Sequence, residues 1–265
     1  MSPQEVDATA LRLFEAERSG VQTGLISLAH PQAGMDDAYR IQAAFVARKM
    51  AAGRTRIGWK IGLTSRAMQS ALNIDIPDSG VLLDDMLFAN GATIPRGRFI
   101  QPRVAAEIAL VMKTPLQGSE IGVADVLAAT DYLLPSLEIL DTRILRVDPE
   151  TRRARTLVDT VSDNAANAGI VLGDVKLDPA ASDLRWMGAI VLRDGVVEET
   201  GLGAGVLNHP AAGVAWLANR LALYGQSLAA GDIVLSGSFI RPLEALPGST
   251  ILADFGPHGI VQVHF

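Results

Sequence analysis

The pattern of apolar and polar positions divides the chain into a helical beginning and a strand-rich remainder. Residues 3–17 place apolar side chains at helical spacing, and Ser2 precedes them as an N-cap. A second helix is expected to begin at Asp36 or Asp37, which would cap it, and to end at Gly53. These two helices are predicted to form a cover that packs on a later core.

From residue 56 onward, short apolar runs bounded by turn residues replace the helical spacing. Strands are expected at 56–63, 81–83, 103–112, 133–141, 170–172, 187–192, 233–235, 250–255 and 259–265, with a hairpin turn at 193–195. Further helices are expected from Thr64 or Ser65 to Leu72, over 121–130 and over 210–224. The change near residue 56 predicts a helical amino-terminal region, 1–55, and a β-rich catalytic domain, 56–265.

Composition and charge narrow the classes of function. A net charge of -6 argues against a nucleic acid or an anionic membrane as partner. The absence of cysteine excludes disulfides, thiolate metal sites and cysteine nucleophiles, and the 4 histidines show no metal-ligand spacing. The chain has neither a signal-peptide pattern nor an apolar run of about 18 residues, so we expect a cytoplasmic protein.

Two of the apolar strands each carry a glutamate. Glu107 lies within 103–112 and Glu138 within 133–141, where a buried strand ordinarily has no carboxylate. Burying a carboxylate costs several kcal/mol without a partner, so two glutamates on two strands indicate a shared cation. Alternation along the strand places Ala105 on the same face as Glu107. The alternative is that both glutamates face solvent on edge strands.

Lys60 and Asp78 are further candidates for chemistry. Lys60 lies between large apolar neighbours in the strand 56–63, where burial would suit it to proton transfer or to close-range charge stabilisation. The alternative is an edge-strand lysine whose ammonium reaches water. Asp78 lies in the turn-like sequence 77–80, so turn formation is its default explanation.

The stretch 141–155 is rich in arginine. It contains Arg143, Arg146, Arg152, Arg153 and Arg155, with Pro149 marking a turn. A solvated loop is the default interpretation. A loop of this length and charge would also suit closure over a dianionic substrate.

Several longer motifs together resemble one family. They are GWKIGLTS at 58–65, PDSG at 77–80, PSLE at 135–138, DTVSDNAANAG at 159–169, GVLNHP at 205–210 and SGSFIRP at 236–242. They run over nearly the whole chain, which is similar to the fumarylacetoacetate hydrolase superfamily in its branch of 2-keto-4-pentenoate hydratases and oxalocrotonate decarboxylases. The resemblance implies an α+β fold, with a helical amino-terminal cover on a mixed β-roll that encloses the site. It also implies a homo-oligomer.

The resemblance implies a magnesium or manganese site with three carboxylate ligands. Glu107 matches the second glutamate of a Glu-x-Glu pair and Glu138 matches the third ligand, whereas Ala105 stands where the first glutamate is expected. Hard divalent cations take oxygen ligands, and magnesium keeps several waters. Two carboxylates and a chelating substrate would therefore give weak metal binding.

The implied reaction is metal-dependent addition of water to a 2-hydroxy-2,4-dienoate in aromatic catabolism, with a dicarboxylic 2-oxo acid as the small-molecule partner. Lys60 and Asp78 match pocket positions as the catalytic pair, without an assignment of acid and base between them. Ser236, Ser238 and Arg143 are the candidates for substrate binding, and a structural role for the serines stays open.

Three alternatives remain at this point. The first is a metal-dependent 2-oxo acid decarboxylase, which needs the same enolate stabilisation. The second is a weakly active subunit that associates with a decarboxylase partner, because Ala105 removes a ligand. The third is that the natural protein has glutamate at position 105 and that this residue was deliberately replaced by Ala105.

Overall fold

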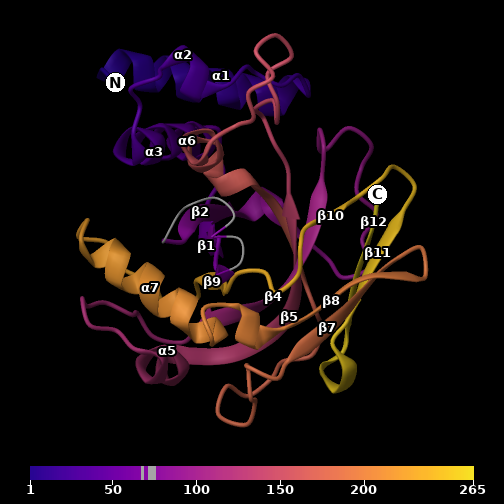
Figure 1. Ribbon diagram of the computed structural model, residues 1–265. Helices are drawn as coiled ribbons and strands as arrows, with labels where there is room; N and C mark the ends of the chain where they lie inside the picture. The colour runs from indigo at the N-terminus through magenta and orange to yellow at the C-terminus, as the bar shows by residue number, and fades with distance from the viewer. Residues whose placement is uncertain (67–68, 71–75) are drawn as a thin grey trace.

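The computed structural model describes residues 1–66, 69–70 and 76–265, with the helical cover at one end of a curled β-structure (Figure 1). The α-helices are α1 (Pro3–Ser19), α2 (Ile26–Ala29), α3 (Met35–Ala51), α5 (Val123–Ala129), α6 (Leu157–Ser162) and α7 (Pro210–Ala222). The strands are β1 (Arg56–Gly62), β2 (Asp78–Leu83), β3 (Leu87–Phe88), β4 (Arg103–Met112), β5 (Thr130–Leu140), β6 (Asn167–Leu172), β7 (Gly188–Arg193), β8 (Val196–Leu202), β9 (Ile233–Leu235), β10 (Leu243–Glu244), β11 (Thr250–Asp254) and β12 (Ile260–His264). Short 3₁₀ helices lie at Asp84–Met86, Asn164–Ala166, Gly203–Gly205 and Gly256–His258.

The predicted amino-terminal helix is confirmed together with its cap. The Ser2 hydroxyl accepts a hydrogen bond from the Glu5 backbone N–H, and the Glu5 carboxylate accepts one from the Ser2 N–H. The predicted cap of the second helix is wrong. Gly34 is the N-cap of α3, and Asp37 lies inside the first turn, where its carboxylate accepts the Gly34 N–H at 3.3 Å.

In the described residues the strands form two sheets. The larger sheet has the order β2-β1-β9-β4-β5-β6-β3, with β10 also paired to β4, and the smaller has the order β12-β11-β7-β8. The pairs β1–β9 and β3–β6 are parallel and the other pairs are antiparallel. β12 contacts β5 and β6, so the smaller sheet closes against the larger one. The mixed β-roll and the α+β class are therefore confirmed.

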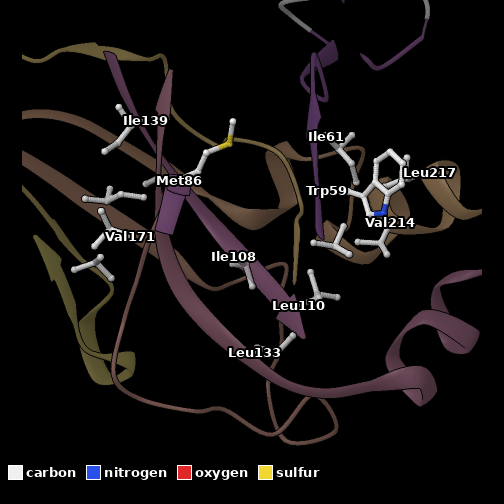
Figure 2. Packing of buried hydrophobic residues seen from close by; sticks show 14 of the residues in the cluster. Trp59, Ile61, Met86, Ile108, Leu110, Leu133, Ile139, Val171, Val214 and Leu217 are labelled. Atoms are coloured by element: carbon white, nitrogen blue, oxygen red, sulfur yellow. The ribbon is translucent and has the colours of Figure 1, made fainter. Parts of the chain in front are cut away.

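The apolar core lies between the large sheet and the elements packed on it. Figure 2 shows Trp59 and Ile61 of β1 beside Val214 and Leu217 of α7, whose apolar stripe faces the sheet. Burial of each such side chain contributes about 1.5–3 kcal/mol. The helical cover contains most of a second apolar cluster, in which α1 and α3 pack around Phe45 and Ile144 joins them from the later chain.

Hydrogen bonds fix the cover on the roll. The Gln42 side-chain amide of α3 is buried and donates to the carbonyl oxygens of Ser79 and Val161, both at 2.9 Å. Lys49 of α3 forms an ion pair with Glu17 of α1 at 2.6 Å. These contacts hold the helices against β2, which contributes to the site.

Two further sequence expectations concern helices. The predicted helix from Thr64 or Ser65 to Leu72 extends into residues outside the described ranges; within them, the Gln69 N–H donates to the Ser65 carbonyl at 2.9 Å. Among the described residues, no helix has both the length and the apolar character needed to cross a membrane.

Candidate active site

A cavity of about 410 Å³ opens on the face of the large sheet that lies opposite the apolar core. Strand alternation produces this arrangement, because successive side chains point to opposite faces. In β1, Trp59 and Ile61 join the core while Lys60 lines the cavity. In β4, Ala106 and Ile108 face the core, whereas Ala105 and Glu107 line the cavity.

The two glutamates are buried in adjacent strands in the interior of the sheet. Glu107 is 1% exposed and Glu138 is 2% exposed, so the alternative that both face solvent is wrong. In the antiparallel pairing of β4 with β5, Ala105 lies opposite Glu138 and Glu107 lies opposite Ser136. The two carboxylates are thus diagonal neighbours on one face, within reach of each other.

Burial and a like charge act together on Glu107. Loss of solvent raises the pKa of its carboxyl well above the usual value, and the neighbouring Glu138 raises it further, although Lys60 opposes both. Its Oε2 accepts the backbone N–H of Gly237 at 2.9 Å. Glu138 is held separately, since its Oε1 accepts the Asn167 side-chain amide at 2.8 Å.

Lys60 is enclosed by acids. Its Nζ lies 3.4 Å from Glu138 Oε1 and 3.9 Å from Asp78 Oδ1, and the residue is 2% exposed. Burial alone would lower the pKa of the ammonium, but the charges of Glu138 and Asp78 outweigh it and the pKa is raised. The alternative of a lysine that reaches water is therefore wrong, and Lys60 is a buried cation at neutral pH.

Asp78 begins strand β2 instead of forming a turn, so the turn interpretation is wrong. It pairs with Gly62 of β1 and its side chain is buried in the cavity. Burial raises the pKa of its carboxyl, and Lys60 only partly offsets this. Among the described residues its Oδ1 has no hydrogen-bond partner. A Cβ at Gly62 would meet this oxygen at 2.3 Å, so glycine at position 62 makes room for the carboxylate.

The structure separates the candidate substrate-binding residues. Ser238 lines the cavity, but its Oγ donates to the Ile240 carbonyl at 2.7 Å. Ser236 is fully buried and does not line the cavity. Between them, the backbone of Gly237 makes the contact with Glu107.

Arg143 is not at the cavity, which corrects its assignment to the substrate. It is 1% exposed and its guanidinium forms an ion pair with Asp163, which is fully buried. Its Nη1 also lies 3.4 Å from Glu17 Oε2 of the cover. These acids already balance its charge. Arg155, from the same stretch of sequence, lines the cavity instead.

The donor set of the cavity suits a hard divalent cation, with fewer ligands than the sequence resemblance implies. Glu107 and Glu138 supply two buried carboxylates, and Ala105 lies beside them without an oxygen. Within the described ranges, no group of three or more acidic or histidine side chains is arranged to hold a metal ion. A cation between the two glutamates would relieve the repulsion that raises the pKa of Glu107.

Sequence reasoning missed three residues that support this site. Gly237 holds Glu107, and Asn167 holds Glu138. Both lie inside motifs that carried the family resemblance, which was the available signal. Arg155 was one of a group of arginines, and nothing in the sequence distinguished it from Arg143.

Relatives of the chain are found by both sequence and structure. No family model matches it. It is 51% identical over 256 residues to 2-oxo-hept-4-ene-1,7-dioate hydratase of Escherichia coli, covering 97% of this chain and 96% of that protein. The structure of 4-oxalocrotonate decarboxylase from Pseudomonas putida G7, complexed with magnesium and adipate, matches with a TM-score of 0.94 at 31% identity, over 100% of this chain and 98% of that one.

A more distant structure shares the fold alone. Fumarylacetoacetate hydrolase from psychrophilic Exiguobacterium antarcticum matches with a TM-score of 0.57 at 13% identity, over 79% of this chain and 74% of that one. The resemblance to hydratases and decarboxylases read from the sequence motifs is confirmed by the Escherichia coli and Pseudomonas putida relatives, and the fold of fumarylacetoacetate hydrolase is shared. The chain belongs to the family of 2-oxo-dienoate hydratases and 4-oxalocrotonate decarboxylases.

Proposed function

We propose that the protein is a hydro-lyase that adds water to a 2-hydroxy-2,4-dienoate of the 2-oxo-heptenedioate type, giving a 4-hydroxy-2-oxo acid. The observation that carries this proposal is the cavity in which the buried carboxylates of Glu107 and Glu138 lie beside the buried ammonium of Lys60. A dienol that becomes a ketone needs positive charge near its oxygen and a group that moves protons. The identity of 51% to the Escherichia coli hydratase supports the same reaction class.

Magnesium or manganese fits the two glutamates, which would hold the cation with their buried oxygens. The magnesium in the Pseudomonas putida decarboxylase structure supports this proposal. When bound, the cation would polarise the substrate carboxylate and the C2 oxygen and so stabilise negative charge on them.

The charges of the surrounding side chains support distinct roles for Lys60 and Asp78. Glu138 and Asp78 keep Lys60 protonated, so it acts as a cation beside the enolate oxygen and as the acid that protonates the substrate carbon, and the proton of the enol hydroxyl replaces the one it gives. Asp78 has a raised pKa and an oxygen without a hydrogen-bond partner among the described residues. It is therefore the group available to orient the attacking water and to take its proton.

The replacement Ala105→Glu is expected to tighten magnesium binding at least tenfold, or by about 1.4 kcal/mol. Ala105 lies opposite Glu138 and lines the cavity, so the new carboxylate would join the existing pair. Titration calorimetry at fixed pH measures the change, with Ala105→Gln as a control of the same shape and no charge. Equal affinities of the two variants would mean that residue 105 does not reach the cation.

The replacement Glu107→Gln is expected to abolish magnesium binding and to stabilise the metal-free protein at high pH. The pKa of Glu107 is higher in the folded state than in the unfolded state. The stability that this residue contributes is therefore complete below the unfolded pKa of 4.5 and is lost as pH rises through the folded-state pKa. For one such group, the free energy of unfolding changes by up to about 1.4 kcal/mol per pH unit. Urea unfolding in a chelator at several pH values compares the two proteins, and a variant that binds magnesium like the parent would contradict the assignment.

A metal-dependent 2-oxo acid decarboxylase is the second candidate, favoured by the match to the Pseudomonas putida structure. A weakly active subunit that associates with a decarboxylase is a third, because Ala105 supplies no ligand. The test is a magnesium titration with 2-hydroxyhepta-2,4-dienedioate, in which loss of dienol absorbance and the product are both followed. Formation of the hydrated keto acid is expected. Release of carbon dioxide from an oxalocrotonate-type acid would establish the decarboxylase, and no turnover at high magnesium would indicate the inactive subunit.

We also propose a cytoplasmic location, a homo-oligomer and association with a decarboxylase partner, as predicted from the sequence, and a role in homoprotocatechuate catabolism. We also keep the division into a helical amino-terminal region, 1–55, and a catalytic domain, 56–265, as a proposal. It is supported by a second apolar cluster, most of which lies in the cover and which Ile144 joins from the later chain.

A further inference from the structure

The cavity contains an arginine that the proposed reaction does not use. Arg155 lines the cavity together with Leu140 and Thr160. Its position is fixed by a hairpin-like loop, in which Val147 and Ala154 form an antiparallel bridge and the Arg155 N–H donates to the Arg146 carbonyl at 2.9 Å. The side chain is thus held at the cavity wall by the backbone of the loop.

Arg155 differs from the other arginines near the site in its partners. Arg143 is paired with Asp163, and Arg241, which also lines the cavity, is paired with Glu199 at 2.7 Å. In the part of the chain that the structure describes, no acidic side chain forms an ion pair with Arg155. Its Nη1 donates to the Thr142 hydroxyl at 2.9 Å, which leaves further N–H donors for a ligand.

Other arginines lie near Arg155. Burial lowers the pKa of its guanidinium, Asp163 opposes this effect, and Arg103 adds to it. Arg146 shows the same effect more strongly, since burial lowers its pKa to about 10 and Arg103 and Arg155 add to the shift. An anion bound at this place would offset repulsion among these cations.

Strand β5 connects the carboxylate pair to this basic region. Along β5, Glu138 is followed by Leu140 and, beyond the strand, by Thr142, the partner of Arg155. Four extended residues span at most about 14 Å. A seven-carbon chain with C–C bonds of about 1.5 Å spans about 8 Å when extended, which lies within this limit. Ala105 and Leu140 line the same cavity and offer small and apolar surface to a carbon chain.

We propose that Arg155 binds the distal carboxylate of a dianionic substrate and sets the preference for dicarboxylic over monocarboxylic acids. This inference rests on the proposed function for the identity of the substrate, but its binding step is testable without turnover. The contact would be a charge-assisted hydrogen bond, which contributes more than a neutral one and is directional when both guanidinium nitrogens take part.

The test compares binding of heptanedioate and heptanoate by titration calorimetry in magnesium buffer. The two acids have the same length and differ only in the distal carboxylate. The parent protein is expected to prefer heptanedioate at least tenfold, and Arg155→Met is expected to reduce the preference to less than about threefold. Arg155→Lys, which keeps the charge and loses the planar fork, should retain part of it. Arg241→Met is the matched control and should leave the preference unchanged, because Glu199 already pairs with Arg241.

The proposal would be overturned by a parent protein without preference, by a preference that survives Arg155→Met, or by equal loss in Arg241→Met. Kinetics with 2-hydroxyhepta-2,4-dienedioate and 2-hydroxyhepta-2,4-dienoate repeat the comparison as kcat/KM. A preference in binding without turnover of either acid would support the role of Arg155 and overturn the hydratase proposal. The two inferences therefore fail separately.

Discussion

Lys60→Met is expected to lower kcat by about 10²- to 10⁴-fold, the range for loss of a positioned proton-transfer group. The methionine keeps the apolar stem and deletes the charge. The Lys60 ammonium lies 3.4 Å from Glu138 and 3.9 Å from Asp78, so its loss removes both the proton donor and the cation that faces the enolate oxygen. Magnesium should bind the variant at least as tightly as the parent, because a cation beside its ligands is gone.

A lower kcat together with undiminished metal affinity would show that Lys60 acts in the chemical step and not in the assembly of the metal site. Steady-state kinetics at saturating magnesium and titration calorimetry measure the two quantities. Lys49→Met is the matched control, since Lys49 is also buried and is paired with Glu17 at 2.6 Å, but lies in the cover. It should reduce stability and leave kcat within about threefold. An unchanged kcat in Lys60→Met would show that this ammonium is only a structural partner of Glu138.

Local patterns in the sequence were sufficient for much of the fold. Alternation along 103–112 placed Ala105 and Glu107 on one face, and both line the cavity. The turn at 193–195 is the predicted hairpin, in which Asp194 and Gly195 adopt positive φ. These features depend on neighbours within a few residues, so the sequence pattern contains the information.

Other features depend on partners far along the chain, and these were predicted less well. Asp78 reads as a turn residue because turn propensity is local, but its strand is fixed by pairing with Gly62. Local sequence around Arg143 does not reveal Asp163, and the ion pair with that residue is what removes Arg143 from the cavity. Arg155 differs only in having Thr142 as its partner. The choice between two arginines of one loop is therefore a tertiary property.

Arg143→Met is expected to destabilise the protein by about 3–5 kcal/mol, the cost of leaving a buried charge without its partner. Asp163 is fully buried, and its carboxylate accepts the Arg143 backbone N–H at 2.9 Å as well as the guanidinium. Arg143 Nη2 also donates to the carbonyl oxygens of Asp163 and Asn167, at 2.8 and 3.1 Å. All these side-chain bonds are lost together, and Asn167 is the residue that holds Glu138.

The pH dependence of this loss identifies its cause. Burial raises the pKa of Asp163 even beside Arg143, and without the arginine it should rise further. Because the pKa is raised in the folded state, the stability that Asp163 contributes is present below the unfolded pKa of 3.8 and is lost as pH rises. The difference in the free energy of unfolding between Arg143→Met and the parent should therefore grow from pH 4 to pH 7.

Urea unfolding of parent, Arg143→Met and the double variant Arg143→Met/Asp163→Asn at pH 4, 5.5 and 7 measures this difference. The double variant should recover part of the stability at pH 7, because the neutral amide no longer carries the unpaired charge. Arg155→Met is the control from the same loop, and with no ion pair in the described residues it should cost about 1 kcal/mol or less. A loss in Arg143→Met that does not change with pH would assign its stabilising effect to packing instead of charge, because Asp163 and Glu17 are the carboxylates that lose a cation in this variant.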